Sequence, residues 1–146
     1  LRDAGHYSGG LFHRTVKTKP DNQLQNEVKI DVIQAGVHTA AQEQSLAPIE
    51  LERTSVTGVL HKDGAISMAR FGPDSAISEF FICIGDQPEL DFGGKRNPDG
   101  QGFAAFGQGV EDLNVVRKIH TSPADAQRLT PGIRIVSTKR VQNSGK

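Results

Sequence analysis

The alternation of apolar and polar residues predicts a chain of short strands with little helix. Residues 111–120 are the exception, because acidic residues come first there and apolar residues then recur at helical spacing. The predicted strands cover residues 11–16, 28–34, 49–59, 65–69, 80–84, 103–106 and 133–141. Many short strands of this kind favour a mainly β sandwich or closed barrel.

The stretch from residue 64 to residue 81 organises this pattern. Two apolar runs, 65–69 and 80–84, flank a polar loop that turns at Gly72-Pro73. A loop held between two core strands places side chains accurately beside a groove. Residues 38–48 show no clear periodicity, although Ala40-Ala41 and the polar residues around them are compatible with one helical turn.

Composition predicts a single globular domain over residues 1–146, since 36% of the residues are hydrophobic and 23% are charged. Lys plus Arg and Asp plus Glu each number 17, and no basic stripe stands out, which argues against nucleic-acid and anionic-membrane partners. The apolar runs are too short for a transmembrane helix. Cys83 is the only cysteine, which excludes an intrachain disulfide.

Several common functional sites lack their signatures. The five His residues show no metal-ligand spacing, so no metal site is predicted. Gly107-Gln108-Gly109 lacks the third Gly of a dinucleotide fingerprint, and Ser75 lacks a nucleophile elbow. A small barrel that binds carbohydrate or nucleic acid would need an aromatic platform or a basic groove, and neither is evident.

Three motifs in order carry a family resemblance: Phe12-His13-Arg14, the stretch 64–81, and the run 103–107. Together they resemble the cyclophilins, the peptidyl-prolyl cis-trans isomerases, over nearly the whole chain. The resemblance implies a closed, antiparallel, eight-stranded barrel with a helix at each open end, and an activity that needs no cofactor. In that family two strands and most of a helix precede the point where this sequence begins, so we expect the N-terminal strands to be missing here.

The resemblance also implies a site. Arg14 takes the place of the catalytic arginine, Phe81 that of the floor of the proline pocket, and Gln34 that of a glutamine bonded to both substrate and arginine. Strand alternation further puts Phe12 on the face of Arg14. The predicted substrate-binding residues are Phe12, Val32, Gln34, Met68, Ala69, Arg70, Phe71, Glu79, Phe81, Leu90 and Phe103.

Two departures from the family pattern affect this site. Asp31 and Val32 stand where a Phe-Met pair is usual, so one aromatic wall is either missing or supplied from elsewhere. Glu79 replaces a glutamine. Because Glu79 and Phe81 share one face of a strand, we expect the carboxylate close to the Arg14 guanidinium. There it either holds the arginine in its working rotamer or competes with the substrate for hydrogen-bond donors, and we favour competition because a carboxylate is the stronger acceptor.

Two functions stay open. The first is a bacterial-like, monomeric prolyl isomerase that acts on exposed X-Pro bonds of unfolded chains and assists folding, in the periplasm or secreted rather than in the cytoplasm. The second is a catalytically weak proline-peptide binding or chaperone module with the same groove. Arg14, Phe81 and Leu90 favour the enzyme, whereas Asp31 and Glu79 favour the binding module.

Overall fold

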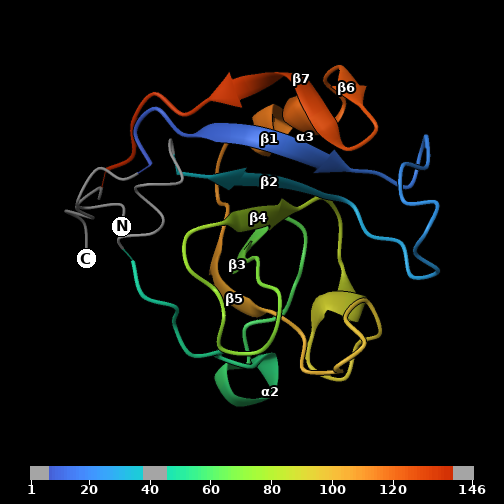
Figure 1. Cartoon of the computed structure of the whole chain (residues 1–146), viewed down its shortest axis with the longest axis vertical. Coiled ribbons are helices and arrows are strands. Elements are labelled where there is room, and N and C mark those ends of the chain that lie inside the picture. Colours follow the sequence, from blue (N-terminus) through green and yellow to red (C-terminus); the bar gives the residue numbers. More distant parts are fainter. Residues whose placement is uncertain (1–6, 38–45, 140–146) are drawn as a thin grey trace.

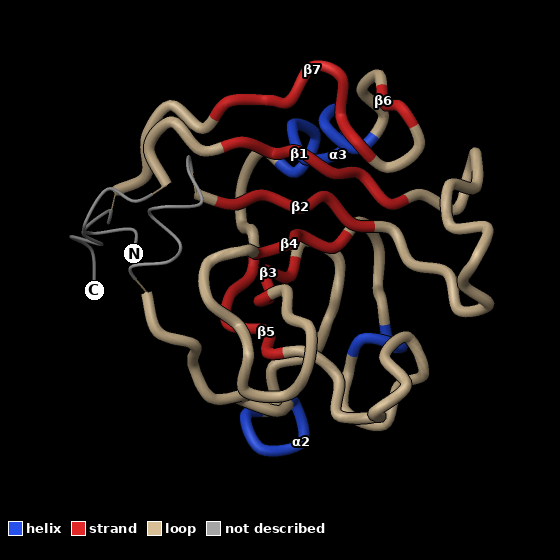
Figure 2. The backbone as a smooth tube through the Cα atoms, in the orientation of Figure 1, coloured by secondary structure: helices blue, strands red, loops and turns tan. Residues whose placement is uncertain are grey.

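Seven strands form one antiparallel sheet in the computed structural model, which describes residues 7–37 and 46–139. The strands follow the order β5-β3-β4-β2-β1-β7-β6 across the sheet (Figures 1 and 2). Their bounds are β1 Leu11–Val16, β2 Val32–Gly36, β3 Ala65–Met68, β4 Phe80–Cys83, β5 Ala104–Gln108, β6 Ala124–Asp125 and β7 Arg128–Arg134. Two α-helices, α2 Thr54–Thr57 and α3 Leu113–His120, and a 3-10 turn, η1 Pro88–Leu90, complete the described elements.

The predicted mainly β architecture is confirmed, but the predicted closed barrel of eight strands is wrong for the described residues. Closure requires the two edge strands to pair, and β5 and β6 are not hydrogen-bonded to each other. Helix α3 packs against β1 and β2, and α2 lies at the far end of the molecule from β7 (Figure 1). In this described part of the chain, no helix has the length and apolar character needed to cross a membrane.

The predicted strand at residues 49–59 does not form. Ile49 makes a single bridge to Ala76, and the next available amide, that of Leu51, donates to the Asp74 carboxylate at 2.8 Å instead of to a strand. Residues 54–57 then form one helical turn, which ends at Gly58 with a φ of 74°. The apolar residues of this segment are therefore not buried in alternation: Val56 is 84% exposed.

Strand β2 begins later than the pattern predicts, because side chains occupy the backbone groups that precede it. The Gln23 amide bonds both the N–H and the C=O of Ile30, at 3.0 and 2.8 Å. The Asp31 carboxylate accepts the Thr18 amide at 2.9 Å. Residues 28–31 thus form a loop that is fixed by side-chain hydrogen bonds to its backbone and from its own side chains, and regular strand pairing starts only at Val32.

Other element boundaries also differ from the prediction. Strand β7 starts at Arg128 rather than 133, and a bulge in its pairing with β1 accommodates the Pro131 ring, which has no N–H to donate. Helix α3 starts two residues later than predicted, because Asp112 adopts a left-handed φ of 56°. The helical turn considered at Ala40-Ala41 lies outside the described residues.

Successive side chains of β2 and of β4 point to opposite faces of the sheet, so the core is divided between these two faces. On one face Val32, Phe81 and Cys83 belong to a cluster that also includes Val16, Ile30, Ala65 and Leu90. On the other face Ile33 packs with Ile119 of α3 and Leu129 of β7. Helix α3 covers the second cluster, and the pocket described below opens on the side of the first.

Candidate functional site

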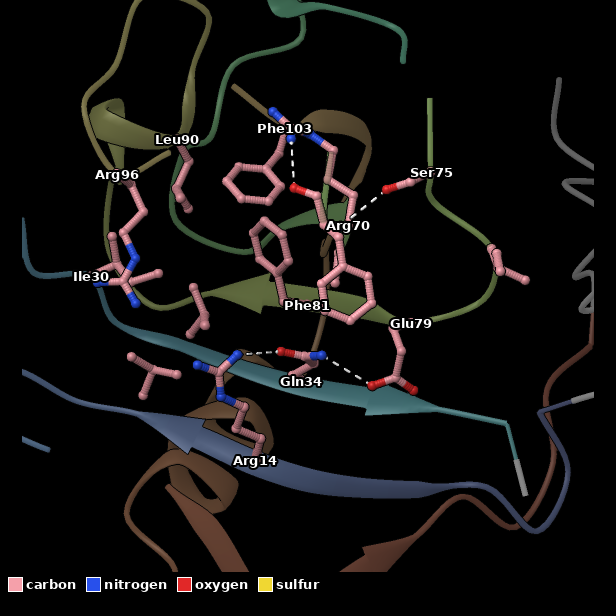
Figure 3. A pocket seen from close by; sticks show the side chains of 15 residues that line it. Arg14, Ile30, Gln34, Arg70, Ser75, Glu79, Phe81, Leu90, Arg96 and Phe103 are labelled. Carbon is pink, nitrogen blue, oxygen red and sulfur yellow. Dashed lines mark hydrogen bonds between the residues drawn. The ribbon is translucent and has the colours of Figure 1, made fainter. Parts of the chain in front are cut away.

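A pocket of about 260 Å³ opens on the face of the sheet that carries Val32 and Phe81 (Figure 3). Its walls come from strands β1, β2 and β4 and from the loops 17–31, 69–79 and 85–103. The lining residues are Arg14, Val16, Ile30, Val32, Gln34, Ala69, Arg70, Phe71, Ser75, Ile77, Glu79, Phe81, Leu90, Arg96 and Phe103.

One cross-strand row forms the floor of the pocket. Arg14 of β1 lies opposite Gln34 of β2, and Gln34 lies opposite Phe81 of β4. Phe81 in turn pairs with Ser67 of β3. Directly opposed residues project from the same face of a sheet, so strand register alone places the arginine, the glutamine and the aromatic ring side by side.

Two hydrogen bonds hold the Arg14 guanidinium. Its Nε donates to Gln127 Oε1 at 2.8 Å, and its Nη1 donates to Gln34 Oε1 at 2.9 Å. No group among the described residues accepts from Nη2. Burial lowers the pKa of Arg14, and the Glu79 charge acts in the opposite direction. An arginine stays protonated under such shifts, so the pocket contains an oriented cation with a free donor.

Glu79 reaches Arg14 only through Gln34. Gln34 Nε2 donates to Glu79 Oε1 at 3.0 Å (Figure 3). His13 Nε2 lies 2.5 Å from the same oxygen. No ion pair joins Glu79 to Arg14 among the described side chains. The structure therefore differs from the predicted direct approach, because His13 and Gln34 share the carboxylate. Burial and the Glu79 charge together raise the pKa of Tyr7 to about 12.

The apolar half of the pocket is built around Phe81, which is 5% exposed. The Phe103 ring meets it edge-on at 5.4 Å, and the Arg70 guanidinium lies 4.9 Å from the centre of the Phe103 ring. Arg70 also donates to the Gly102 carbonyl and pairs with Asp99, whose pKa it lowers. The Arg70 side chain thus holds the Phe103 wall in place and is itself only 1% exposed.

The wall opposite Phe103 is formed without the Phe-Met pair that is usual in the family. Asp31 is turned away from the pocket, toward Thr18 and His120. Ile30 and Arg96 line the pocket instead. The loops 17–31 and 85–103 therefore meet and supply this wall themselves.

Ten of the twelve predicted site residues line this pocket, and Phe12 and Met68 do not. Both belong to the adjacent row across the sheet, in which Ala35 pairs with Phe12 and Phe80 pairs with Met68. This row projects from the opposite face. The prediction for Phe12 assumed unbroken alternation in β1, but a bulge between Phe12 and Arg14 reverses the alternation there.

The sequence interpretation missed six residues that shape the site. Period-two alternation puts Val16 on the face of Arg14 and Ile30 on the face of Val32, so the apolar pattern could have identified both. Ser75 and Ile77 lie in the loop that the sequence singled out. Arg96 and Gln127 carried no signal, because each reaches the site from a loop distant in sequence.

His61 supports the pocket floor from behind. Its ring stacks on Phe81 with centroids 5.9 Å apart and planes inclined by 14°. Its Nδ1 lies 2.7 Å from Asp91 Oδ1, and its Nε2 lies 2.8 Å from Ser67 Oγ. Only 1% of His61 is exposed, so this histidine is a buried and fully bonded member of the core.

We expect this burial to make stability depend on pH. Burial lowers the pKa of His61, against the opposing influence of Asp91. The unfolded imidazole protonates near pH 6.5, above the folded one, so the free energy of unfolding should fall as the pH drops below about 6.5, by at most about 1.4 kcal/mol per pH unit. Urea unfolding at pH 7.5 and 5.5 measures this loss. His61→Gln should show a smaller loss, and an equal loss in both proteins would contradict the assignment.

Comparison with known proteins agrees with this geometry. Residues 1–140 match the family model described as cyclophilin type peptidyl-prolyl cis-trans isomerase/CLD. The chain also resembles the structure of a Cryptosporidium parvum cyclophilin type peptidyl-prolyl cis-trans isomerase, determined in the presence of the dipeptide Ala-Pro. The TM-score is 0.66 with 18% identity, over 96% of this chain and 79% of that one, which supports the fold.

Two bacterial relatives are named peptidyl-prolyl cis-trans isomerases. The one from Streptomyces antibioticus is 34% identical over 119 residues, which cover 80% of this chain and 63% of that protein. The one from Acinetobacter baylyi is 33% identical over 119 residues, 80% of this chain and 54% of that protein. The chain therefore spans somewhat more than half the length of these relatives. By its family match, its fold and its site, it belongs to the cyclophilin-type peptidyl-prolyl cis-trans isomerase family.

Proposed function

We propose that this chain accelerates the cis-trans isomerisation of X-Pro peptide bonds in unfolded or flexible protein chains, with Arg14 as the catalytic residue. The observation that carries the proposal is the Arg14 guanidinium, which is fixed by Gln34 and Gln127 and retains a free Nη2 donor beside the apolar floor made by Phe81. All of these residues come from one chain, so the proposed site needs no second copy, and we propose that the enzyme acts as a monomer.

The chemistry of the reaction fits this arrangement. Rotation about the C–N bond has a barrier of about 18–20 kcal/mol because the bond is partly double. At the top of the barrier the amide resonance is lost, and the prolyl nitrogen gains a lone pair that accepts a hydrogen bond. No covalent bond breaks, so the protein needs only to hold the proline and to aim a donor at its nitrogen.

The pocket offers a place for each part of such a substrate. Phe81, Leu90 and Phe103 form an apolar socket for the proline ring. The loop 69–71 lines the adjacent edge, where we place the main chain that precedes the proline. The Cryptosporidium relative, whose structure was determined with Ala-Pro present, supports by analogy a proline-containing peptide as the ligand.

A turnover assay separates the enzyme from the binding module. Catalytic amounts of the protein are added to a short X-Pro peptide that was prepared enriched in the cis isomer, and the approach to equilibrium is recorded. The uncatalysed step takes roughly tens to hundreds of seconds, and acceleration in proportion to protein concentration is expected. Saturable binding of the peptide without any acceleration would favour the binding module and overturn the proposal.

Glu79 should act as a positioning residue through Gln34. The Glu79 carboxylate accepts from Gln34 Nε2 and thereby keeps Gln34 Oε1 turned toward Arg14. Removing one such hydrogen bond costs about 0.5–1.5 kcal/mol. In the turnover assay we therefore expect Glu79→Leu to lower kcat/KM by roughly two- to tenfold.

A matched substitution tests this mechanism. Glu79→Gln keeps an oxygen that can accept from Gln34, so it should recover most of the kcat/KM that Glu79→Leu loses. Gly36→Ala should behave like Glu79→Leu, because an added Cβ would lie 1.3 Å from Glu79 Oε2 and would displace the carboxylate. A several-fold gain in turnover for Glu79→Gln would instead indicate that the carboxylate competes with the substrate.

A further inference from the structure

Arg96 is a third cation at the proposed proline pocket, beside Arg14 and Arg70. It lies in the loop between β4 and β5, and its Nη1 donates to Gln23 Oε1 and to the Val28 carbonyl, both at 2.7 Å. Gln23 is 1% exposed and is itself bonded to Lys17 and Ile30. This buried anchor fixes the guanidinium at the pocket wall, so Arg96 is not a freely moving surface arginine.

The guanidinium groups of Arg14 and Arg96 both have unused donors, whereas Arg70, the third arginine at the pocket, is paired with Asp99. Arg96 uses only Nη1, so its Nε and Nη2 have no acceptor among the described residues, just as Arg14 Nη2 has none. Neither Arg14 nor Arg96 forms an ion pair in the described part of the chain. The one carboxylate that lines the pocket, Glu79, is held by His13 and Gln34.

The two arginines lie close enough to affect each other. Figure 3 shows Arg96 with Ile30 at one end of the pocket and Glu79 with Ser75 at the other, and the Arg14 guanidinium projects into the pocket between them. Burial lowers the pKa of Arg96, and the Arg14 charge lowers it further. Two partly buried like charges with spare donors are stabilised when an anion binds between them.

We propose that Arg96 and Arg14 together form a carboxylate subsite, so that the pocket prefers X-Pro sequences with a carboxylate just after the proline. This inference rests on the proposed function. The main chain before the proline is placed at the loop 69–71, so the chain after the proline leaves toward Arg96. The carboxylate can come from an acidic side chain that follows the proline or from the C-terminus of a chain that ends in proline.

Paired peptides test the subsite. The amidated peptides Ala-Ala-Pro-Glu and Ala-Ala-Pro-Gln differ only in charge, and Ala-Ala-Pro is used as free acid and as amide. For each pair we measure the ratio of kcat/KM and, by NMR titration, the ratio of Kd. We expect the charged member to be preferred about three- to tenfold at low salt, and less in 0.5 M NaCl, where charges are screened. Preference confined to one pair identifies the source of the carboxylate.

Three variants locate the effect. Arg96→Gln should bring the charged-to-neutral ratio close to one, whereas Arg96→Lys should keep part of the preference. Lys95→Gln removes an exposed cation from the neighbouring position and should leave the ratio unchanged. Ratios near one in both pairs for the unmodified protein would overturn the subsite. Absent turnover on all peptides would instead overturn the proposed function, and the Kd ratios would still decide the subsite.

Discussion

Replacing Arg14 with Lys is expected to lower kcat/KM on an X-Pro peptide at least tenfold while leaving the stability of the protein nearly unchanged. Lysine keeps the positive charge but loses the planar fork, which here bonds Gln127 and Gln34 and leaves Nη2 pointing free. A charge-assisted hydrogen bond contributes about 1.5–3 kcal/mol, which corresponds to roughly ten- to a hundredfold in rate. Arg14→Ala also loses the charge, so its kcat/KM should fall further.

The control for this experiment is Arg134→Lys, since Arg134 is exposed on β7 and does not line the pocket. Its kcat/KM should match that of the parent. Denaturant unfolding of each variant shows whether a loss of turnover comes from a loss of folded protein. Turnover that survives in both Arg14 variants would remove Arg14 from the mechanism.

Phe81→Ala is expected to have the largest effect on stability. The ring is 5% exposed and lies between Phe103 and His61 in the core. Truncation of a buried Phe costs about 3–5 kcal/mol, a large fraction of the roughly 5–15 kcal/mol that stabilises a typical domain. Because the same ring is the proposed floor of the proline socket, binding of an X-Pro peptide should weaken as well.

Two companion variants separate these effects. Phe81→Leu keeps an apolar side chain and should fold. Leucine lacks the flat aromatic face that contacts the proline ring, so the Kd of this variant for the peptide should still rise. Ile82→Ala alters the next residue, which packs in the cluster on the opposite face of the sheet. It should lose stability and yet retain the parent Kd. A Phe81→Leu protein that binds peptide as tightly as the parent would place Phe81 outside the site.

The regular part of the site was predictable because it depends on strand register. Strand β2 is buried on both faces and every second residue of β4 is buried, so their apolar runs stand out, and period-two alternation then puts Gln34 with Val32 and Phe81 with Glu79. The association of Gln34 with Arg14 came from the family resemblance. The same reasoning failed for Phe12, because a bulge in β1 has no signature in the apolar pattern.

The irregular part was not predictable because side chains distant in sequence determine it. The contact of Arg96 with Gln23 joins residues 73 positions apart, and Gln127 reaches Arg14 across 113 positions. Local propensity also misled at residues 49–59, where the Asp74 carboxylate takes a backbone amide that a neighbouring strand would otherwise bond. Loops of this kind follow from tertiary contacts and not from periodicity.

The central claim, that the Arg14 pocket isomerises X-Pro bonds, is tested most directly by two-dimensional NMR exchange spectroscopy. A short Ala-Pro-containing peptide is mixed with about one-hundredth as much protein, and exchange between its cis and trans resonances is recorded. Exchange cross-peaks are expected with the parent protein and should be strongly reduced with Arg14→Ala, while pocket resonances such as those of Phe81 still shift on titration with peptide. Binding at the pocket without exchange cross-peaks, or equal exchange with Arg14→Ala, would contradict the claim.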